Sequence, residues 1–100
     1  MNALDRQATW DYWRGRCGAC GELLGELGVV HHRKAKGMGG TSDPDKDKPP
    51  RTIPLHDSGH KWVHANPKLA RQYGLIVPQW ADPATVPVTR VPAEYGACRP

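Results

Sequence analysis

The stretch VVHHRKAKGMGGTSDPDKDKPPRTIPLHDSGHKWVHANP, residues 29–67, decides the fold of this chain and holds all five of its histidines. It begins with an apolar pair that runs into the adjacent His31 and His32. It ends with His60 and His64, four residues apart in a segment that can be helical. Residues four apart on a helix share one face. Two histidine pairs facing each other could hold a metal ion.

The residues around these pairs predict the order helix, strand, loop, strand, helix. Residues 3–13 fit a short amphipathic helix whose aromatic side chains would pack in the core. Residues 23–30 end in an apolar run that favours a strand leading into His31, and residues 52–55 favour a second strand that pairs with it. The intervening residues 37–50 are rich in Gly, Asp and Pro, a composition typical of a loop.

The second histidine pair, His60 and His64, lies in the segment whose sequence most clearly predicts a helix. Asp57 or Ser58 can cap a helix over residues 59–65, which an Asn-Pro pair interrupts. A second short helix is expected over residues 68–73, closed by a glycine, and a small strand over residues 75–77.

Length and composition indicate one small domain. One hundred residues, of which 38% are hydrophobic and none is Phe, offer little apolar surface to bury. We expect a single domain over residues 1–100, with a core at residues 17–78 and an extended Pro-rich tail over residues 79–100. A bound metal would help such a chain to fold.

Charge and hydropathy indicate which class of partner to expect and whether the chain enters a membrane. The formal charge of +4 and the pI near 9.2 favour a polyanionic partner, although a solvated surface alone could produce them. The chain has no apolar run of about 18 residues, and its N-terminus lacks a basic region followed by an apolar core. We therefore expect a protein that is neither membrane-bound nor exported.

Cys17 and Cys20 form a CxxC pair within C-G-A-C-G, where small residues suit a tight turn around a metal. In a small intracellular protein such a pair is more often half of a zinc site than a disulfide. A redox-active pair or two ordinary thiols is the alternative. No alternation of strands and helices supports a thioredoxin-like fold.

The order of elements and the histidine pairs resemble the HNH nuclease family. The resemblance covers residues 17–78 and is closest to small HNH proteins of bacteriophages, through HHRKAKGMGG and GHKWVHANP. The double His followed by HxxxH is also similar to the colicin-type DNases. The fold class implied is α+β: a small ββα-metal (HNH) domain with an N-terminal helix, a CxxC zinc turn and an extended Pro-rich C-terminal tail.

The resemblance implies a metal-dependent DNA endonuclease or nickase that hydrolyses phosphodiester bonds. His32 matches the general base, a role that suits an imidazole. The positions that match the metal ligands are His31, His60 and His64. Arg51 matches the family's Asn, but Arg has no acceptor with which to orient an imidazole. A backbone carbonyl or the Thr52 hydroxyl would replace it, or Arg51 would grip the scissile phosphate.

The adjacent histidines pose a geometric problem. Neighbouring residues on a regular strand point to opposite faces, so His31 and His32 reach one phosphate only if the strand ends or bends there. If the strand continued regularly through Arg33, one of the two would be an ordinary packed or surface histidine.

The resemblance also implies a structural zinc site. HNH proteins with a CxxC usually complete it with a second CxxC just before the final His, and those positions here are His56 and Gly59, of which only the histidine can bind. Cys17, Cys20 and His56 would supply three ligands. Cys98 in the tail is the candidate fourth ligand, or a free thiol.

Basic side chains near the histidines are expected to contact the phosphates of double-stranded DNA. They are Arg33, Lys34, Lys36 and Lys61. Three histidine ligands favour zinc or nickel, while manganese or magnesium could act when substrate oxygens join the shell. The likeness to phage proteins implies a role in genome packaging or DNA end processing beside the terminase subunits, in the cytoplasm of a bacterial host cell.

Two other functions use the same residues. A degenerate HNH domain, or a zinc-stabilised module built on a Cys₂His₂ set, would bind DNA without cleaving it; its pairs would be Cys17 with Cys20 and His60 with His64. The long segment between the pairs argues against a zinc finger, which separates them by about a dozen residues. A structural phage protein with a basic face would need no metal and would not account for the clustered histidines.

Overall fold

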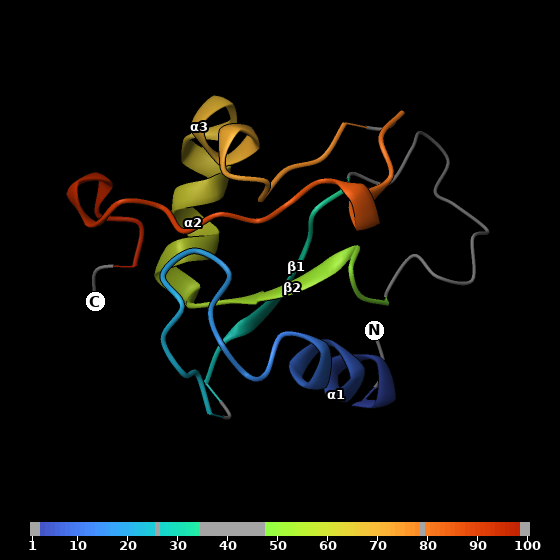
Figure 1. The fold of residues 1–100 in the computed structure, drawn as a ribbon. Coiled ribbons are helices and arrows are strands. Elements are labelled where there is room, and N and C mark those ends of the chain that lie inside the picture. Colours follow the sequence, from blue (N-terminus) through green and yellow to red (C-terminus); the bar gives the residue numbers. More distant parts are fainter. Residues whose placement is uncertain (1–2, 26, 35–47, 79, 99–100) are drawn as a thin grey trace.

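The computed structural model describes residues 3–25, 27–34, 48–78 and 80–98 (Figure 1). Within these residues the fold is a small α+β arrangement of three α-helices, one two-stranded antiparallel sheet and two short 3-10 turns. The elements are α1 (Ala3–Tyr12), β1 (Val29–His32), β2 (Thr52–Leu55), α2 (Asp57–Ala65), α3 (Pro67–Gln72), η1 (Pro83–Thr85) and η2 (Ala93–Tyr95). The predicted order of a helix, two strands and two further helices is confirmed, while most of the loop predicted over residues 37–50 lies outside the described residues.

The β1–β2 hairpin is regular up to the end where the connecting loop leaves it, here called its loop end. His32 pairs with Thr52, and the N–H of Arg33 donates to the carbonyl of Arg51 at 2.7 Å, one pair beyond the assigned strands. Hydrogen-bonded and non-hydrogen-bonded pairs alternate in an antiparallel ladder, so Pro54 falls in a non-hydrogen-bonded pair. Its missing N–H therefore costs no ladder bond, which explains how a proline sits inside a strand.

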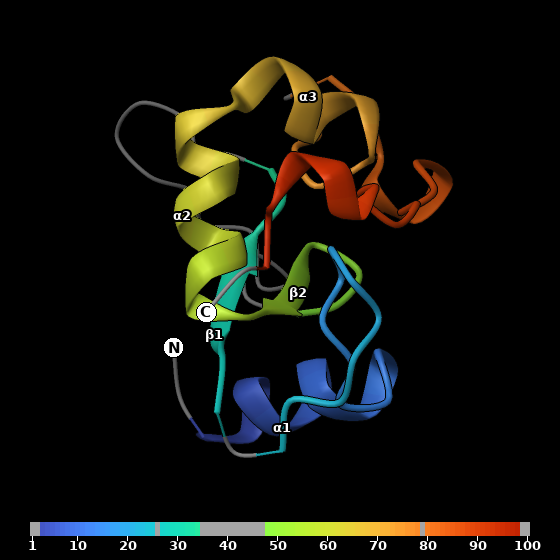
Figure 2. The same ribbon diagram turned by 90° about the vertical axis from the view of Figure 1, so that its left-hand side faces the viewer.

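Helix α1 and helix α2 lie on opposite sides of the hairpin, α1 beneath it and α2 above it in both views (Figures 1 and 2). The indole of Trp13 donates to the carbonyl of Thr52 at 2.7 Å. The Thr9 hydroxyl donates to the carbonyl of Asp5 at 2.9 Å and lies 2.7 Å from the Thr52 hydroxyl. Since Thr9 has one proton, Thr52 is the donor in this buried pair.

The cysteine turn packs against β2 at close range. The N–H of Gly18 donates to the carbonyl of Pro54 at 2.8 Å. A Cβ at Gly18 would overlap the side chain of Ile53, so only glycine allows this approach. The core beneath the turn is made of small and medium apolar side chains. Its fully buried members include Ile53, Leu55, Val63, Ala70 and Leu75.

The tail over residues 80–98 is mostly extended, as predicted, and crosses the body beside α2 (Figure 2). The N–H of Val91 donates to the carbonyl of Ala19 at 2.8 Å, and the N–H of Thr89 donates to the carbonyl of Tyr73 at 3.0 Å. These bonds attach the tail both to the cysteine turn and to the end of α3.

Arg33 attaches the start of the tail and is only 1% exposed. Its guanidinium donates to four backbone carbonyls from segments far apart in the chain. They are Gly74 at 2.8 Å, Pro50 at 3.0 Å, Pro83 at 3.1 Å and Val86 at 2.6 Å. The prediction that Arg33 contacts DNA phosphates is therefore wrong, because the side chain is buried and its donors are occupied.

Three local predictions need correction. Helix α2 begins at Asp57 with His56 as its N-cap and without a side-chain cap bond, so neither Asp57 nor Ser58 caps it. Residues 75–77 form no strand; Val77 makes only an isolated parallel bridge with Lys34, because they meet the end of β1 at a single pair. Tyr12 is exposed and not a core residue. In the described part of the chain, no helix has the length and apolar character needed to cross a bilayer.

Candidate metal centres

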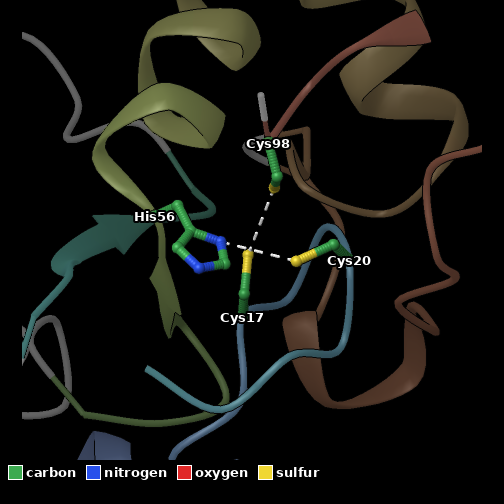
Figure 3. Close-up of side chains that lie close together, drawn as sticks. All are labelled: Cys17, Cys20, His56 and Cys98. Atoms are coloured by element: carbon green, nitrogen blue, oxygen red, sulfur yellow. Dashed lines mark hydrogen bonds between the residues drawn. The ribbon is translucent and has the colours of Figure 1, made fainter. Parts of the chain in front are cut away.

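Three cysteines and one histidine from three separate segments converge on one point (Figure 3). Cys17 and Cys20 lie in a turn that the N–H of Gly21 closes by donating to the carbonyl of Cys17 at 2.8 Å. His56 immediately precedes α2, and Cys98 comes from the tail. The donor atoms of Cys17, Cys20, His56 and Cys98, here called the cysteine cluster, all lie within 4.8 Å of one another.

The spacing within the cysteine cluster fits tetrahedral coordination. The sulfurs of Cys17 and Cys98 lie 3.6 Å apart, and the sulfur of Cys20 lies 3.4 Å from Nδ1 of His56. Bond lengths typical of zinc would place such pairs about 3.8 Å and about 3.5 Å apart. A disulfide needs about 2.0 Å, and all three cysteines are free thiols. The cysteine cluster could therefore hold a metal ion, with Cys98 in the predicted fourth place.

Crowding of the thiols makes Cys17 the most acidic of the three. The Cys98 thiol, which donates to the sulfur of Cys17, and next the backbone N–H groups of His56, Cys20 and Ala19 together lower the pKa of Cys17 to about 4, against the opposing effect of burial. The contact with Cys17 and burial raise the pKa of Cys98, and burial raises that of Cys20. A thiolate is the form that binds metal, so a divalent cation would favour loss of the remaining protons.

Gly59 makes room for the ligand from the tail. A Cβ at this position would lie 3.2 Å from the sulfur of Cys98, closer than ordinary contact. In the resembled family, this position would carry the last cysteine of the set. In this chain the Cys98 sulfur occupies the space that a side chain at position 59 would enter.

A second group of ligands lies between β1 and α2. The ligand atoms of His31, His60 and His64, here called the histidine cluster, also lie within 4.8 Å of one another. Nε2 of His60 is 3.1 Å from Nε2 of His64, as one helical turn dictates. The His31 ring centroid lies 5.3 Å from that of His60 and 6.0 Å from that of His64. Nitrogens around one tetrahedral ion are about 3.3 Å apart, so these three residues could hold a metal ion.

The orientation of His31 is set by a backbone carbonyl. Its Nε2 lies 2.7 Å from the oxygen of Leu75, which can only accept, so Nε2 carries the proton and Nδ1 keeps a lone pair. His31 is buried, and burial lowers its pKa to about 4. Burial, and next the charge of His64, lower the pKa of His60. Neutral imidazoles with free lone pairs are the form that binds a metal ion.

His32 lies outside the histidine cluster. The ladder continues regularly past it to Arg33, so His31 and His32 point to opposite faces of the hairpin. Burial follows the same alternation, with His31 and Arg33 buried while His32 and Lys34 are half-buried. His32 therefore lies on the face that Lys34 shares, and its predicted role as the base stays a prediction.

Arg51 lies at the loop end of the hairpin, directly before Thr52, which pairs with His32. Its carbonyl accepts from Arg33, and its half-buried side chain lines a cleft with Lys34. The Thr52 hydroxyl is buried and donates to Thr9, so its proton is already used, while Thr52 itself is the residue that pairs with His32 across the ladder.

The three lysines that were also predicted to contact DNA differ in their surroundings. The Lys34 ammonium donates to the carbonyl of Ala81 at 3.2 Å at the edge of the cleft. Lys61 is exposed and pairs with Asp57 at 3.1 Å along α2. Lys36 lies outside the described residues.

Sequence reasoning missed two features of these centres. The carbonyl of Leu75 orients His31, but a main-chain acceptor has no signature in the sequence. The cleft that Lys34 and Arg51 line also includes Lys48 and Trp80. A tryptophan isolated in a Pro-rich tail was the available signal for it.

The fold and its clusters define a small α+β protein with two groups of side chains that could each bind a metal ion. Comparison of the chain with protein-family models, curated proteins and solved structures finds no match. The geometry of the two clusters and the resemblance of their motifs are the two observations that bear on function.

Proposed function

We propose that this chain is a metal-dependent endonuclease or nickase of the HNH type that hydrolyses phosphodiester bonds of double-stranded DNA. The observation that supports this most directly is the histidine cluster. His31 from a strand and His60 with His64 from the following helix bring three imidazole nitrogens together, of which that of His64 belongs to an exposed side chain. Three ligands leave open positions for a substrate oxygen, which is typical of catalytic sites.

A divalent ion bound there would neutralise the charge that develops on the phosphate and stabilise the leaving oxygen. The residues of the chain would do the remaining work. The Leu75 carbonyl keeps Nδ1 of His31 free of a proton. His32 is the proposed base that takes the proton from the attacking water, and from its place on the opposite face of the hairpin it would have to reach that water around the end where the connecting loop leaves. Arg51, with its fork of donors, would hold a non-bridging phosphate oxygen.

The cysteine cluster would hold a structural zinc ion in the same proposal. Three thiolates and one imidazole in tetrahedral spacing are a donor set that zinc prefers, and they leave no position open. This site would tie the cysteine turn and the tail to His56 at the start of α2. Since His60 and His64 follow His56 by one and two helical turns, the zinc site would also hold the catalytic helix in place.

One observation favours a second candidate, a zinc-stabilised domain that binds DNA without cutting it. His32 lies on the opposite face of the ladder from His31, and Arg51 replaces the residue expected to orient it. The setting of phage genome packaging beside terminase subunits, in the cytoplasm of a bacterial host, follows from the resemblance alone and stays a prediction.

Supercoiled plasmid distinguishes the two candidates. Purified protein would be incubated with Mg²⁺, Mn²⁺, Ni²⁺ or Zn²⁺, beside His60→Ala and His32→Ala, with Lys68→Ala as a control on an exposed surface of α3. The nuclease predicts metal-dependent nicking that both histidine variants lose while their circular dichroism is unchanged. DNA binding without cleavage under any ion would support the second candidate. Neither binding nor cleavage by folded protein would overturn both.

A further inference from the structure

A basic cleft with one exposed tryptophan lies at the loop end of the hairpin, beyond His32 and Thr52. It has a volume of about 530 Å³ and is lined by Lys34, Lys48, Arg51, Trp80 and Asp82, with prolines 49, 50 and 83. This volume falls within the range of small-molecule sites. Three cations and one carboxylate line the cleft, which gives it a positive potential suited to an anion.

The walls of the cleft are held in position by contacts of the described chain. The Lys34 ammonium reaches across to the carbonyl of Ala81 at 3.2 Å. The Asp82 carboxylate accepts from the N–H of Ala84 at 2.9 Å, so the cleft's one acidic group also caps η1. The buried guanidinium of Arg33 joins the two sides from beneath by donating to Pro50 and Pro83.

Trp80 is the most exposed large apolar side chain among the described residues, at 87%. Its indole is thus available to stack on a planar ligand. Aromatic side chains beside cationic groups bind single-stranded nucleic acid in this manner, the ring against a base and the cations against the backbone. A paired base would not present its face, because its neighbours in the duplex cover it.

The cleft lies beside the proposed catalytic residues. Lys34 follows His32 by two residues, which is about 7 Å along an extended chain and the same face of it. Arg51 precedes Thr52, the strand partner of His32. A strand bound with one phosphate near His32 would thus place its next nucleotide over Lys34 and Arg51.

We infer that this cleft, on the His32 side of the hairpin, binds one unpaired nucleotide of the DNA, with its base on Trp80 and its phosphate between Lys34, Lys48 and Arg51. The inference rests on the proposed function in that it takes DNA as the ligand. It goes further by assigning a preference: the protein binds DNA with an unpaired nucleotide more tightly than fully paired duplex.

The test compares two fluorescein-labelled hairpin DNAs whose stems span the same length. One stem is fully paired, and the other has a gap in one strand that leaves three nucleotides of the opposite strand unpaired. Binding is measured by anisotropy without added divalent metal. The full-length protein is measured beside Trp80→Ala, Trp80→Phe and Lys48→Ala. Leu4→Ala is the control for loss of an exposed apolar side chain, and Lys68→Ala for loss of a surface charge.

We expect the wild type to bind the gapped hairpin about tenfold more tightly than the paired one, the size of a single base–aromatic stack. Trp80→Ala should lose this preference while its affinity for the paired hairpin stays within about twofold, and Trp80→Phe should keep most of it. Lys48→Ala should weaken binding of both hairpins more than Lys68→Ala does, since a backbone contact is independent of pairing.

Equal binding of both hairpins by the wild type, or an equal loss for both in Trp80→Ala, would overturn the inference. The plasmid assay keeps this result separate from the proposed function. Cleavage by the wild type with no preference for the gap would leave the nuclease and remove the subsite. A preference that Trp80→Ala loses, in a protein that cuts nothing, would leave the subsite and remove the nuclease.

Discussion

The cysteine cluster and the histidine cluster use the same helix in different ways. His56 at the N-cap of α2 belongs to the first, while His60 and His64, one and two turns later, belong to the second. The cysteine cluster has four donors, of which the most buried is Cys17, and it joins segments 81 residues apart in sequence. The histidine cluster has three donors, and His64 is exposed.

In the proposed function, one short helix would supply ligands both to an ion that stabilises the fold and to an ion that acts in catalysis. A closed set of four ligands satisfies its ion completely, so the ion can only contribute to stability. An open set of three ligands at the surface leaves room for a substrate oxygen. We therefore expect changes in the cysteine cluster to affect the free energy of unfolding and changes in the histidine cluster to affect activity.

The largest effect is expected for Cys17→Ser. Removal of the most buried ligand would abolish metal binding at the cysteine cluster, and metal binding at such sites supplies on the order of 10 kcal/mol of folding free energy. We expect the cooperative unfolding transition in urea to disappear. A cooperative transition close to that of the wild type would contradict a structural role for the cluster.

A smaller loss is expected for Arg33→Ala, which tests the attachment of the tail that needs no metal. The substitution leaves the carbonyls of Gly74, Pro83 and Val86 in the interior without their donor. Removal of one partner from buried polar groups typically costs about 3 kcal/mol or more. Urea unfolding measures it, with Lys34→Ala as the control, for which we expect about 1 kcal/mol or less.

The conservative variant Arg33→Lys, compared with Lys34→Ala, tests whether Arg33 contacts DNA. If its guanidinium is buried as described, Arg33→Lys that still folds should bind paired DNA as the wild type does. A loss of DNA affinity larger than that of Lys34→Ala would show instead that Arg33 reaches the ligand.

A third prediction moves the fourth ligand of the cysteine cluster from the tail to the helix. Cys98→Ser should weaken the cysteine cluster by a smaller amount, since three ligands and the turn remain. Adding Gly59→Cys to this variant should restore metal affinity, because a Cβ at position 59 lies 3.2 Å from the place of the Cys98 sulfur. Metal content after dialysis against a chelator measures both. A double variant that binds metal no better than Cys98→Ser alone would show that the helix cannot supply the ligand.

The smallest effect on stability is expected for His60→Ala. The side chain is half-buried at the surface, and its loss should change the free energy of unfolding by about 1 kcal/mol or less. Cleavage of plasmid in the presence of Ni²⁺ or Mn²⁺ should nevertheless vanish. Loss of the unfolding transition in this variant would erase the distinction between the two clusters.

Local signals in the sequence predicted which neighbouring cysteines and histidines would come together. The CxxC turn and the four-residue spacing of His60 and His64 each specify a geometry within one short element, and the structure places them accordingly. The strand over residues 52–55 was also predicted with its bounds, since an apolar run is flanked there by charged and polar residues.

The features that sequence reasoning missed depend on segments far apart in the chain. Arg33 stands in a basic run that is typical of a solvated surface, yet its four acceptors lie 17 to 53 residues further along. The absence of a capping side chain on α2 follows from the use of His56 in the cysteine cluster, which the local sequence Asp57-Ser58 does not reveal. Long-range hydrogen bonds to carbonyls leave no residue pattern to detect.

We propose that the cysteine cluster binds an ion for stability and that the histidine cluster binds one for activity. Native mass spectrometry of the full chain during gradual chelation, paired with plasmid nicking and the urea transition at each step, tests it most directly. We predict that the ion lost first comes from the more open histidine cluster, and that its loss ends nicking while the unfolding transition persists. Loss of the unfolding transition with the first ion released, or nicking that continues after it, would contradict the account.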